Sequence, residues 1–110
     1  MNIQERQIGE ITVIELSGRL TVNDQPGLLR DAVADAARRG GRDVLLDLAG
    51  VNYIDSTRLG ELITAHVSLS RQGGTLKLIR IPSKILELLT MVGLDTVFRR
   101  YDSIEDAQRP

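Results

Sequence analysis

Hydrophobic and polar positions along the chain predict strands that alternate with helices. Residues 44–49 form a short apolar run rich in branched side chains, which is typical of a strand buried on both faces. Residues 50–52 follow as a predicted turn, and from residue 56 onward apolar side chains recur at helical spacing. One side of this central helix is apolar and contains Leu59, Leu62, Ile63, His66 and Leu69. Open α/β folds usually carry their functional groups where such a helix starts, at the rim of the sheet.

The N-terminal part of the chain predicts a hairpin. Residues 3–8 and 11–17 read as two extended segments joined by Gly9-Glu10, and Gly18 is predicted to end the second segment. A loop over residues 20–25 follows.

The next segment is an amphipathic helix, predicted to run from Pro26 to Arg38 or Arg39. Proline suits the first position of a helix, and Gly40-Gly41 are predicted to stop it. Its apolar stripe consists of Leu28, Leu29, Ala32, Val33 and Ala36.

Beyond the central helix, which Gly73-Gly74 end, the pattern predicts three further elements. Residues 75–81 alternate as a strand with one more exposed face. A third helix follows, with Ser83 as its candidate cap, and residues 97–101 indicate a short edge strand. Residues 102–107 begin a last short helix.

Strands that alternate with helices predict a mainly parallel sheet, and the N-terminal hairpin makes this sheet mixed. We therefore expect an α/β fold with four to five strands and about four helices packed against them. The chain has 110 residues, of which 42% are hydrophobic, and it carries no evident repeat or linker. This composition suits a single domain over residues 1–110.

Composition and charge narrow the possible partners. The formal net charge is −1, so the sequence shows no basic footprint for nucleic acid or a membrane surface. The absence of cysteine excludes disulfides and agrees with a reducing cytoplasm. The first residues lack the apolar core of a signal peptide, and no segment approaches the roughly 18 apolar residues that span a bilayer. We expect a soluble cytoplasmic protein without membrane insertion.

Catalysis and metal binding find little support in the sequence. The single histidine, His66, falls within the apolar stripe two to three turns from the hydroxyls at the start of the central helix, so we expect it to be a packing residue. Scattered carboxylates lack the spacing of metal ligands, and the paired glycines end helices rather than cradle phosphate. We expect no enzyme activity, no metal and no cofactor.

Three polar residues, Asp55, Ser56 and Thr57, stand at the start of the central helix. Asp55 or Ser56 can cap the helix, whereas Thr57 is predicted to project into solvent. One interpretation is that these residues form an N-cap and nothing more. The other is that Thr57 accepts a phosphate, because a helix start favours negative charge by about 0.3–1 kcal/mol. An unpaired dianion buried in an interface would cost far more, so this phosphate would release a partner and leave the fold intact.

Residues 54–60, Ile-Asp-Ser-Thr-Arg-Leu-Gly, resemble the D-S-[ST]-G-L-G signature of STAS domains, specifically of stand-alone bacterial anti-sigma factor antagonists. Residues 17–20 match the family's G-x-L segment, and Gly73-Gly74 match the turn before a later strand. Residues 91–94 match the segment that closes the third helix of the family, so the resemblance covers nearly the whole chain. It implies a STAS fold and a regulator that binds an anti-sigma factor, often a serine kinase. Phosphorylation by that kinase at the second hydroxyl, here Thr57, would switch the regulator off, and a phosphatase is a further candidate partner.

Three positions depart from the family pattern. Arg58 stands where glycine is usual, Thr57 stands where serine is commoner, and Thr21 stands where an acidic residue often follows G-x-L. Arg58 could pair with a phosphate on Thr57 or could obstruct docking of the kinase, and the sequence does not choose between these roles.

The expected contact surface combines the start of the central helix, its outward residues and the adjoining loop from Leu20 to Asp24. Its candidate residues are Thr21, Asn23, Asp24, Asp55, Ser56, Thr57, Arg58, Glu61 and Thr64. A second function class is a non-catalytic scaffold or accessory subunit of a signalling or transport complex. Such a subunit would form stable complexes that do not depend on Thr57 chemistry.

Overall fold

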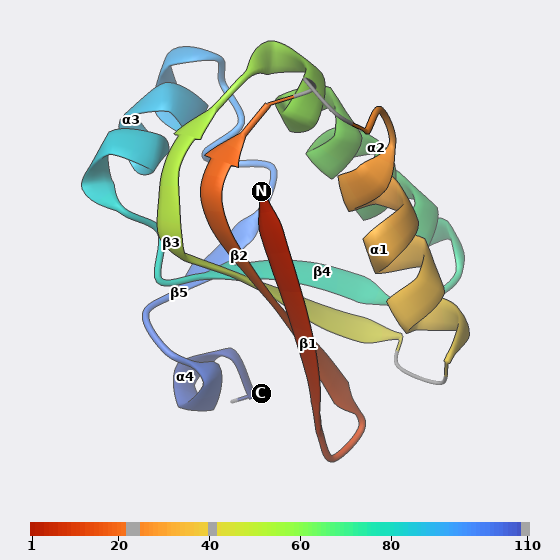
Figure 1. Ribbon diagram of the computed structural model, residues 1–110. Helices are drawn as coiled ribbons and strands as arrows, with labels where there is room; N and C mark the ends of the chain where they lie inside the picture. The colour runs from red at the N-terminus through yellow and green to blue at the C-terminus, as the bar shows by residue number, and fades with distance from the viewer. Residues whose placement is uncertain (22–24, 40–41, 109–110) are drawn as a thin grey trace.

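Figure 1 shows the computed structural model of the protein, which describes residues 1–21, 25–39 and 42–108. Across these residues the chain forms the strands β1 (Asn2–Ile8), β2 (Ile11–Leu20), β3 (Asp43–Ile54), β4 (Thr75–Ile79) and β5 (Arg99–Tyr101). The helices in the same residues are α1 (Leu28–Arg38), α2 (Ser56–Arg71), α3 (Ser83–Met91) and α4 (Ile104–Gln108).

The described strands lie in one sheet of five, in the order β1-β2-β3-β4-β5. β1 and β2 pair antiparallel, and every later pair of neighbours is parallel. Parallel neighbours need a crossover connection, and α1, α2 and α3 supply these crossovers. The predicted α/β fold, a mixed and mainly parallel sheet with four helices in the described residues, is therefore confirmed.

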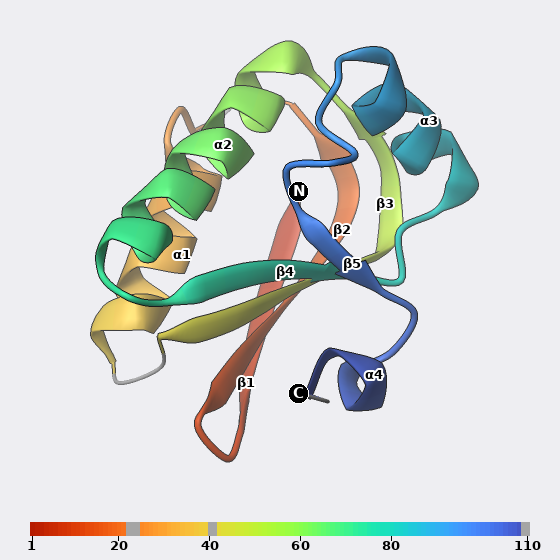
Figure 2. The same ribbon diagram turned by 180° about the vertical axis from the view of Figure 1, so that it is seen from behind.

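Two apolar clusters cover the sheet. The larger cluster joins α1, α2 and α3 to the sheet, and α1 and α2 lie side by side in both views (Figures 1 and 2). The smaller cluster lies at α4 and consists of Val13, Leu45, Ile79 and Ala107. Val44 and Leu46 belong to the larger cluster whereas Leu45 belongs to the smaller one. Because neighbouring strand residues point to opposite faces, β3 is buried on both, as its apolar run predicts.

The predicted breaks in β2 and β3 are wrong. β3 does not turn at residues 50–52 but continues to Ile54, and β2 continues through Gly18 to Leu20. The register of the two strands shifts twice, and one shift follows Gly18, which has a φ of 86°. A Cβ at Gly50 would lie 2.8 Å from Cβ of Ser17. These glycines therefore permit irregular, close pairing of the strands instead of ending them.

The starts of two helices also differ from the predictions. α1 begins at Leu28 rather than Pro26, and its N-cap residue is Gly27, which has a φ of 83° and offers no side-chain cap. Ser83 is the first residue of α3 rather than its cap, because Pro82 holds the extended backbone of the N-cap position. The start of α1 therefore needs a hydrogen-bond acceptor from elsewhere in the molecule.

Two strand boundaries near the C-terminus are shorter than predicted. β4 ends at Ile79 instead of residue 81, since Arg80 has a φ of 53°, which interrupts extended pairing. β5 begins at Arg99 instead of residue 97. Within the described residues, no helix is both long and apolar enough to cross a membrane.

Candidate functional site

The start of α2 lies at the carboxyl ends of β2 and β3. The backbone N–H of Asp55 donates to the carbonyl of Leu20 at 3.0 Å, which ties the end of one strand to the end of the other. The Asp55 carboxylate accepts from the N–H of Arg58 at 2.8 Å, so Asp55, and not Ser56, caps the helix. This cap fixes the direction in which the first turn of α2 leaves the sheet.

Thr57 lies on this first turn with its side chain exposed, and Ser56 beside it is exposed as well. The prediction that Thr57 projects into solvent is therefore confirmed. Its hydroxyl is accessible on a helix start, where a negatively charged group is favoured by the free N–H groups and the helix dipole.

Arg58 and Glu61 do not face outward, so their predicted place on the contact surface is wrong. Arg58 is 0% exposed and Glu61 is 8% exposed. The reason is that α2 has two buried sides. Leu62 and Leu69 pack into the core at the sheet. Arg58 and Glu61 instead lie beside the neighbouring α1 and the end of β2, where they form hydrogen bonds with backbone groups.

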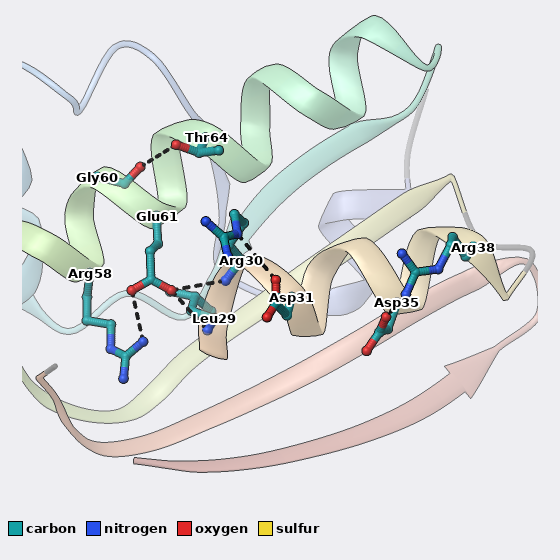
Figure 3. Close-up of polar contacts among 9 residues, drawn as sticks. All are labelled: Leu29, Arg30, Asp31, Asp35, Arg38, Arg58, Gly60, Glu61 and Thr64. Carbon is teal, nitrogen blue, oxygen red and sulfur yellow. Dashed lines mark hydrogen bonds and ion pairs between the residues drawn. The ribbon is translucent and has the colours of Figure 1, made fainter. Parts of the chain in front are cut away.

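Figure 3 shows how Arg58 contacts Glu61 and how Glu61 contacts the start of α1. Arg58 Nη1 donates to Glu61 Oε2 at 2.9 Å, and Arg58 Nε donates to the carbonyl of Thr21 at 3.1 Å. The other carboxylate oxygen of Glu61, Oε1, accepts from the N–H groups of Leu29 at 3.1 Å and Arg30 at 3.2 Å. Glu61 thus caps α1 across the interface between the helices and supplies the acceptor that Gly27 lacks.

The burial of Arg58 bears on both of the roles that the sequence left open for this residue. Pairing with a phosphate on Thr57 and obstruction of a docking kinase both require an exposed guanidinium. The Arg58 side chain is instead directed into the domain and engaged by Glu61 and Thr21. Neither role agrees with its position.

The remaining predicted residues divide into three groups. Thr21 is half-buried, and its carbonyl rather than its hydroxyl makes the contact with Arg58. Thr64 is exposed, but its hydroxyl donates to the carbonyl of Gly60 at 3.0 Å within the helix. Asn23 and Asp24 lie outside the described residues.

The outer side of α2 is uncharged along most of its length. The exposed residues of the segment Ser56–Ser70, all of which the structure describes, are Ser56, Thr57, Gly60, Ile63, Thr64, Val67, Ser68 and Ser70. The charged residues of that segment, Arg58 and Glu61, are turned inward. Charged residues are depleted at the cores of protein interfaces, and this surface, here named the neutral face, lacks them.

Sequence patterning missed the neutral face because it assigned Ile63 to the core. Ile63 is 37% exposed, and Val67, one turn further along, is 39% exposed. Gly60 lies one turn before Ile63, and a Cβ built there meets no described atom within 4 Å. The sequence alone could not reveal this face, because it placed Arg58 and Glu61 among the outward residues, and only the structure shows that both are buried.

His66 is half-buried and packs edge-on against Phe98, with ring centroids 5.2 Å apart and the rings inclined at 64°. The prediction that it is a packing residue is confirmed. In the part of the chain that the structure describes, no three His, Asp or Glu side chains gather as a metal ion would require.

Comparisons with known proteins agree with this arrangement. A family model described as "Mlab, STAS domain" matches residues 3–100. The chain belongs to the STAS domain family. The anti-sigma-B factor antagonist of Bacillus subtilis (strain 168) is 28% identical to this STAS domain over 97 residues, which make up 88% of this chain and 87% of the relative.

Solved structures of STAS-like proteins superpose over nearly all of the chain. The protein TM1081 of Thermotoga maritima matches with a TM-score of 0.84 at 25% identity and covers 94% of this chain and 82% of its own. The anti-sigma factor antagonist SpoIIAA in its unphosphorylated form matches with a TM-score of 0.79 at 18% identity, over 96% of this chain and 92% of its own. Its phosphorylated form from Bacillus matches with a TM-score of 0.71 at 18% identity, over 96% of both chains. The SpoIIAA comparisons establish a shared fold.

Proposed function

We propose that this STAS domain is an anti-sigma factor antagonist. It binds an anti-sigma factor in the cytoplasm through the surface around the start of α2 and so frees a sigma factor. The observation that carries the proposal is the exposed Thr57 hydroxyl on a helix start capped by Asp55, beside the neutral face. The relative from Bacillus subtilis carries the name anti-sigma-B factor antagonist, and its similarity extends over most of both chains.

The partner in this proposal is a kinase-type anti-sigma factor that phosphorylates Thr57. A phosphate there suits the N-terminal turn of α2, because the helix dipole and free N–H groups favour negative charge by about 0.3–1 kcal/mol. The same phosphate within a closed interface would be an uncompensated buried charge, which costs about 3–5 kcal/mol. Since each 1.4 kcal/mol is tenfold in affinity, phosphorylation would release the partner without unfolding the domain. A phosphatase would return Thr57 to its binding form.

The contact residues proposed from the sequence change in two respects. Arg58 and Glu61 leave the surface because they are buried, and Gly60, Ile63 and Val67 join it because they are exposed on the neutral face. Ser56, Thr57 and Thr64 stay, and Asp55 contributes by fixing the helix start.

The test is binding of the kinase-type anti-sigma factor encoded in the same genome, measured by calorimetry. Thr57→Ala keeps the affinity of the wild type, whereas Thr57→Glu lowers it by about tenfold or more, because the added carboxylate is buried without a partner. Gln108→Glu is the matched control, since Gln108 is exposed on α4, which packs on the smaller cluster and not on the one that carries α2. Equal affinities of wild type and Thr57→Glu would refute the switch.

Incubation with the kinase and ATP tests the modification directly. Intact-mass and peptide analysis is expected to find one phosphate, on Thr57, and none on the Thr57→Ala variant. A phosphate on Ser56 instead would move the switch by one residue.

The alternative function is a non-catalytic scaffold or accessory subunit. An uncharged helix face also suits a permanent contact, because such contacts are more apolar than transient ones. Light scattering would then show a stable complex or oligomer that Thr57→Glu leaves intact.

A further inference from the structure

The burial of Arg58 needs an explanation beyond stability. Removing two charges from water is costly, and a well-packed apolar pair in the place of a buried ion pair is often as stable or more stable. Arg58 is nevertheless 0% exposed, and its partner Glu61 is 8% exposed. What this pair supplies, and an apolar pair could not, is a set of directed hydrogen bonds.

These hydrogen bonds reach both described ends of the connection between β2 and α1. Arg58 Nε holds the carbonyl of Thr21, the last described residue after β2, at 3.1 Å. Glu61 Oε1 holds the N–H groups of Leu29 and Arg30, in the first turn of α1, at 3.1 and 3.2 Å. The 2.9 Å bond between Arg58 and Glu61 joins these two anchors into one unit (Figure 3).

The same unit is attached to the Thr57 turn. Arg58 follows Thr57 directly, and its backbone N–H is held by the Asp55 cap at 2.8 Å. One residue is therefore fixed by its backbone to the start of α2 and by its side chain to the end of β2. A guanidinium suits this task because its donors lie on separate nitrogens in a rigid planar fork, whereas the three donors of a lysine ammonium lie on one atom.

Resting on the proposed function, we infer that Arg58 and Glu61 are positioning residues for partner binding. They hold the end of β2 and the start of α1 in a fixed relation to Thr57, so that three elements present one preformed surface. Neither side chain touches the partner. Their substitution therefore weakens binding through the position of the elements that they hold.

Amide hydrogen exchange tests the positioning without any partner. Glu61→Ala removes the acceptor of the Leu29 and Arg30 N–H groups, so both amides are expected to exchange at least about tenfold faster. The amide of Val33, deeper in α1, reports whether the whole helix opens instead, and it is expected to stay close to its wild-type rate. Unchanged exchange at Leu29 and Arg30 would overturn the inference.

Partner affinity tests the functional part. Glu61→Ala and Arg58→Met are each expected to lower affinity for the kinase-type anti-sigma factor by about tenfold. The control is Leu69→Ala, a substitution in the buried far end of α2 that lowers the melting temperature but leaves the start of the helix intact. Wild-type affinity in Glu61→Ala and Arg58→Met, or an equal loss in Leu69→Ala, would overturn the inference.

A double variant keeps the test open if a single substitution prevents folding. Arg58→Met combined with Glu61→Gln leaves no lone buried charge, and the glutamine oxygen can still accept from the start of α1. It is expected to restore slow exchange at Leu29 and Arg30 while affinity stays low, because the bond to Thr21 is lost. Wild-type affinity in this variant would contradict the inference. If the wild type binds no anti-sigma factor, the proposed function fails, and the exchange measurement still decides whether the pair positions α1.

Discussion

Arg80 shows how a single residue can be held in an unfavourable conformation by its partner. Among the described residues other than glycine it has the one positive φ, 53°. Its guanidinium pairs with Asp47, which is 2% exposed, and its Nε donates to Asp47 Oδ1 at 3.2 Å. The hydrogen bond with Asp47 raises the pKa of Arg80, because it favours the charged form of the guanidinium.

Two opposing effects decide the stability of an Arg80→Gly variant. Glycine would relieve backbone strain of about 1–2 kcal/mol. The substitution would also leave the Asp47 carboxylate without its cation, which costs about 3–5 kcal/mol for a fully buried pair and less here because the Arg80 side chain is 48% exposed. We expect a net loss of about 1–2 kcal/mol in the free energy of unfolding, measured in urea. Arg80→Lys, which keeps the charge, should lose less, and a stabilised Arg80→Gly variant would show that strain outweighs the ion pair.

At the scale of single elements, α2 differs from an ordinary surface helix in having three sides with separate roles. One side packs Leu59 and Leu62 into the core, and a second carries Arg58 and Glu61 to the neighbouring helix. The third is the neutral face, which contains Gly60. A glycine within a helix lowers its stability, so its presence on an exposed side points to a need for close approach.

Gly60→Ala should therefore separate stability from binding. The added Cβ meets no described atom within 4 Å, and alanine is favoured over glycine in a helix by about 1 kcal/mol. We expect a higher melting temperature together with weaker binding of the anti-sigma factor, because the methyl group fills the space that the partner approaches. Unchanged affinity would exclude Gly60 from the interface.

Gly74→Ala is the contrasting case, because Gly74 lies in the turn between α2 and β4, where a side chain has no space. A Cβ at Gly74 would lie 2.2 Å from the carbonyl oxygen of Arg42, which is backbone and cannot move freely. We expect a loss of about 1–3 kcal/mol of stability in urea denaturation, with affinity for the partner retained in the folded fraction. A variant as stable as the wild type would mean that the backbone adjusts at this junction.

At the scale of the whole molecule, the two faces of the sheet have different roles. The face under α1 and α2 carries the larger cluster and supports the Thr57 site. The helix α4, which lies apart from α1 and α2 in Figure 2, closes the smaller cluster on Val13, Leu45 and Ile79. Ala107 of α4 is 0% exposed, and Lys77 Nζ donates to its carbonyl at 2.8 Å.

We expect the packing of α4 on the smaller cluster to affect the stability of the domain and not partner binding at the Thr57 site. Ala107→Asp places a carboxylate in the smaller cluster and should lower the free energy of unfolding by about 3 kcal/mol. Gln108→Asp adds the same charge at the next, exposed position and should change stability by less than about 0.5 kcal/mol. Thermal unfolding of the two variants checks this difference, and equal melting temperatures would mean that α4 contributes little.

Local patterns in the sequence were sufficient for the fold and for Thr57, because both depend on neighbours in the chain. The apolar run of β3 and the helical spacing after residue 56 are local signals, as is a capping carboxylate just before a helix. The places of Arg58 and Glu61 depend on distant partners instead. Glu61 caps Leu29, 32 residues earlier, and Arg58 reaches Thr21, 37 residues earlier. The helical projection put Glu61 on the side opposite the apolar stripe, and Arg58 was placed outside with it as a charged residue, because neither distant partner is visible in the local sequence.

The backbone tie between Asp55 and Leu20 has a consequence for the energetics of association. Because the ends of β2 and β3 are already joined and the first turn of α2 is capped, the docking platform loses little conformational entropy when a partner arrives. A small contact surface can then reach a useful affinity. Under the proposed function, one phosphoryl group on Thr57 would be enough to lower that affinity steeply.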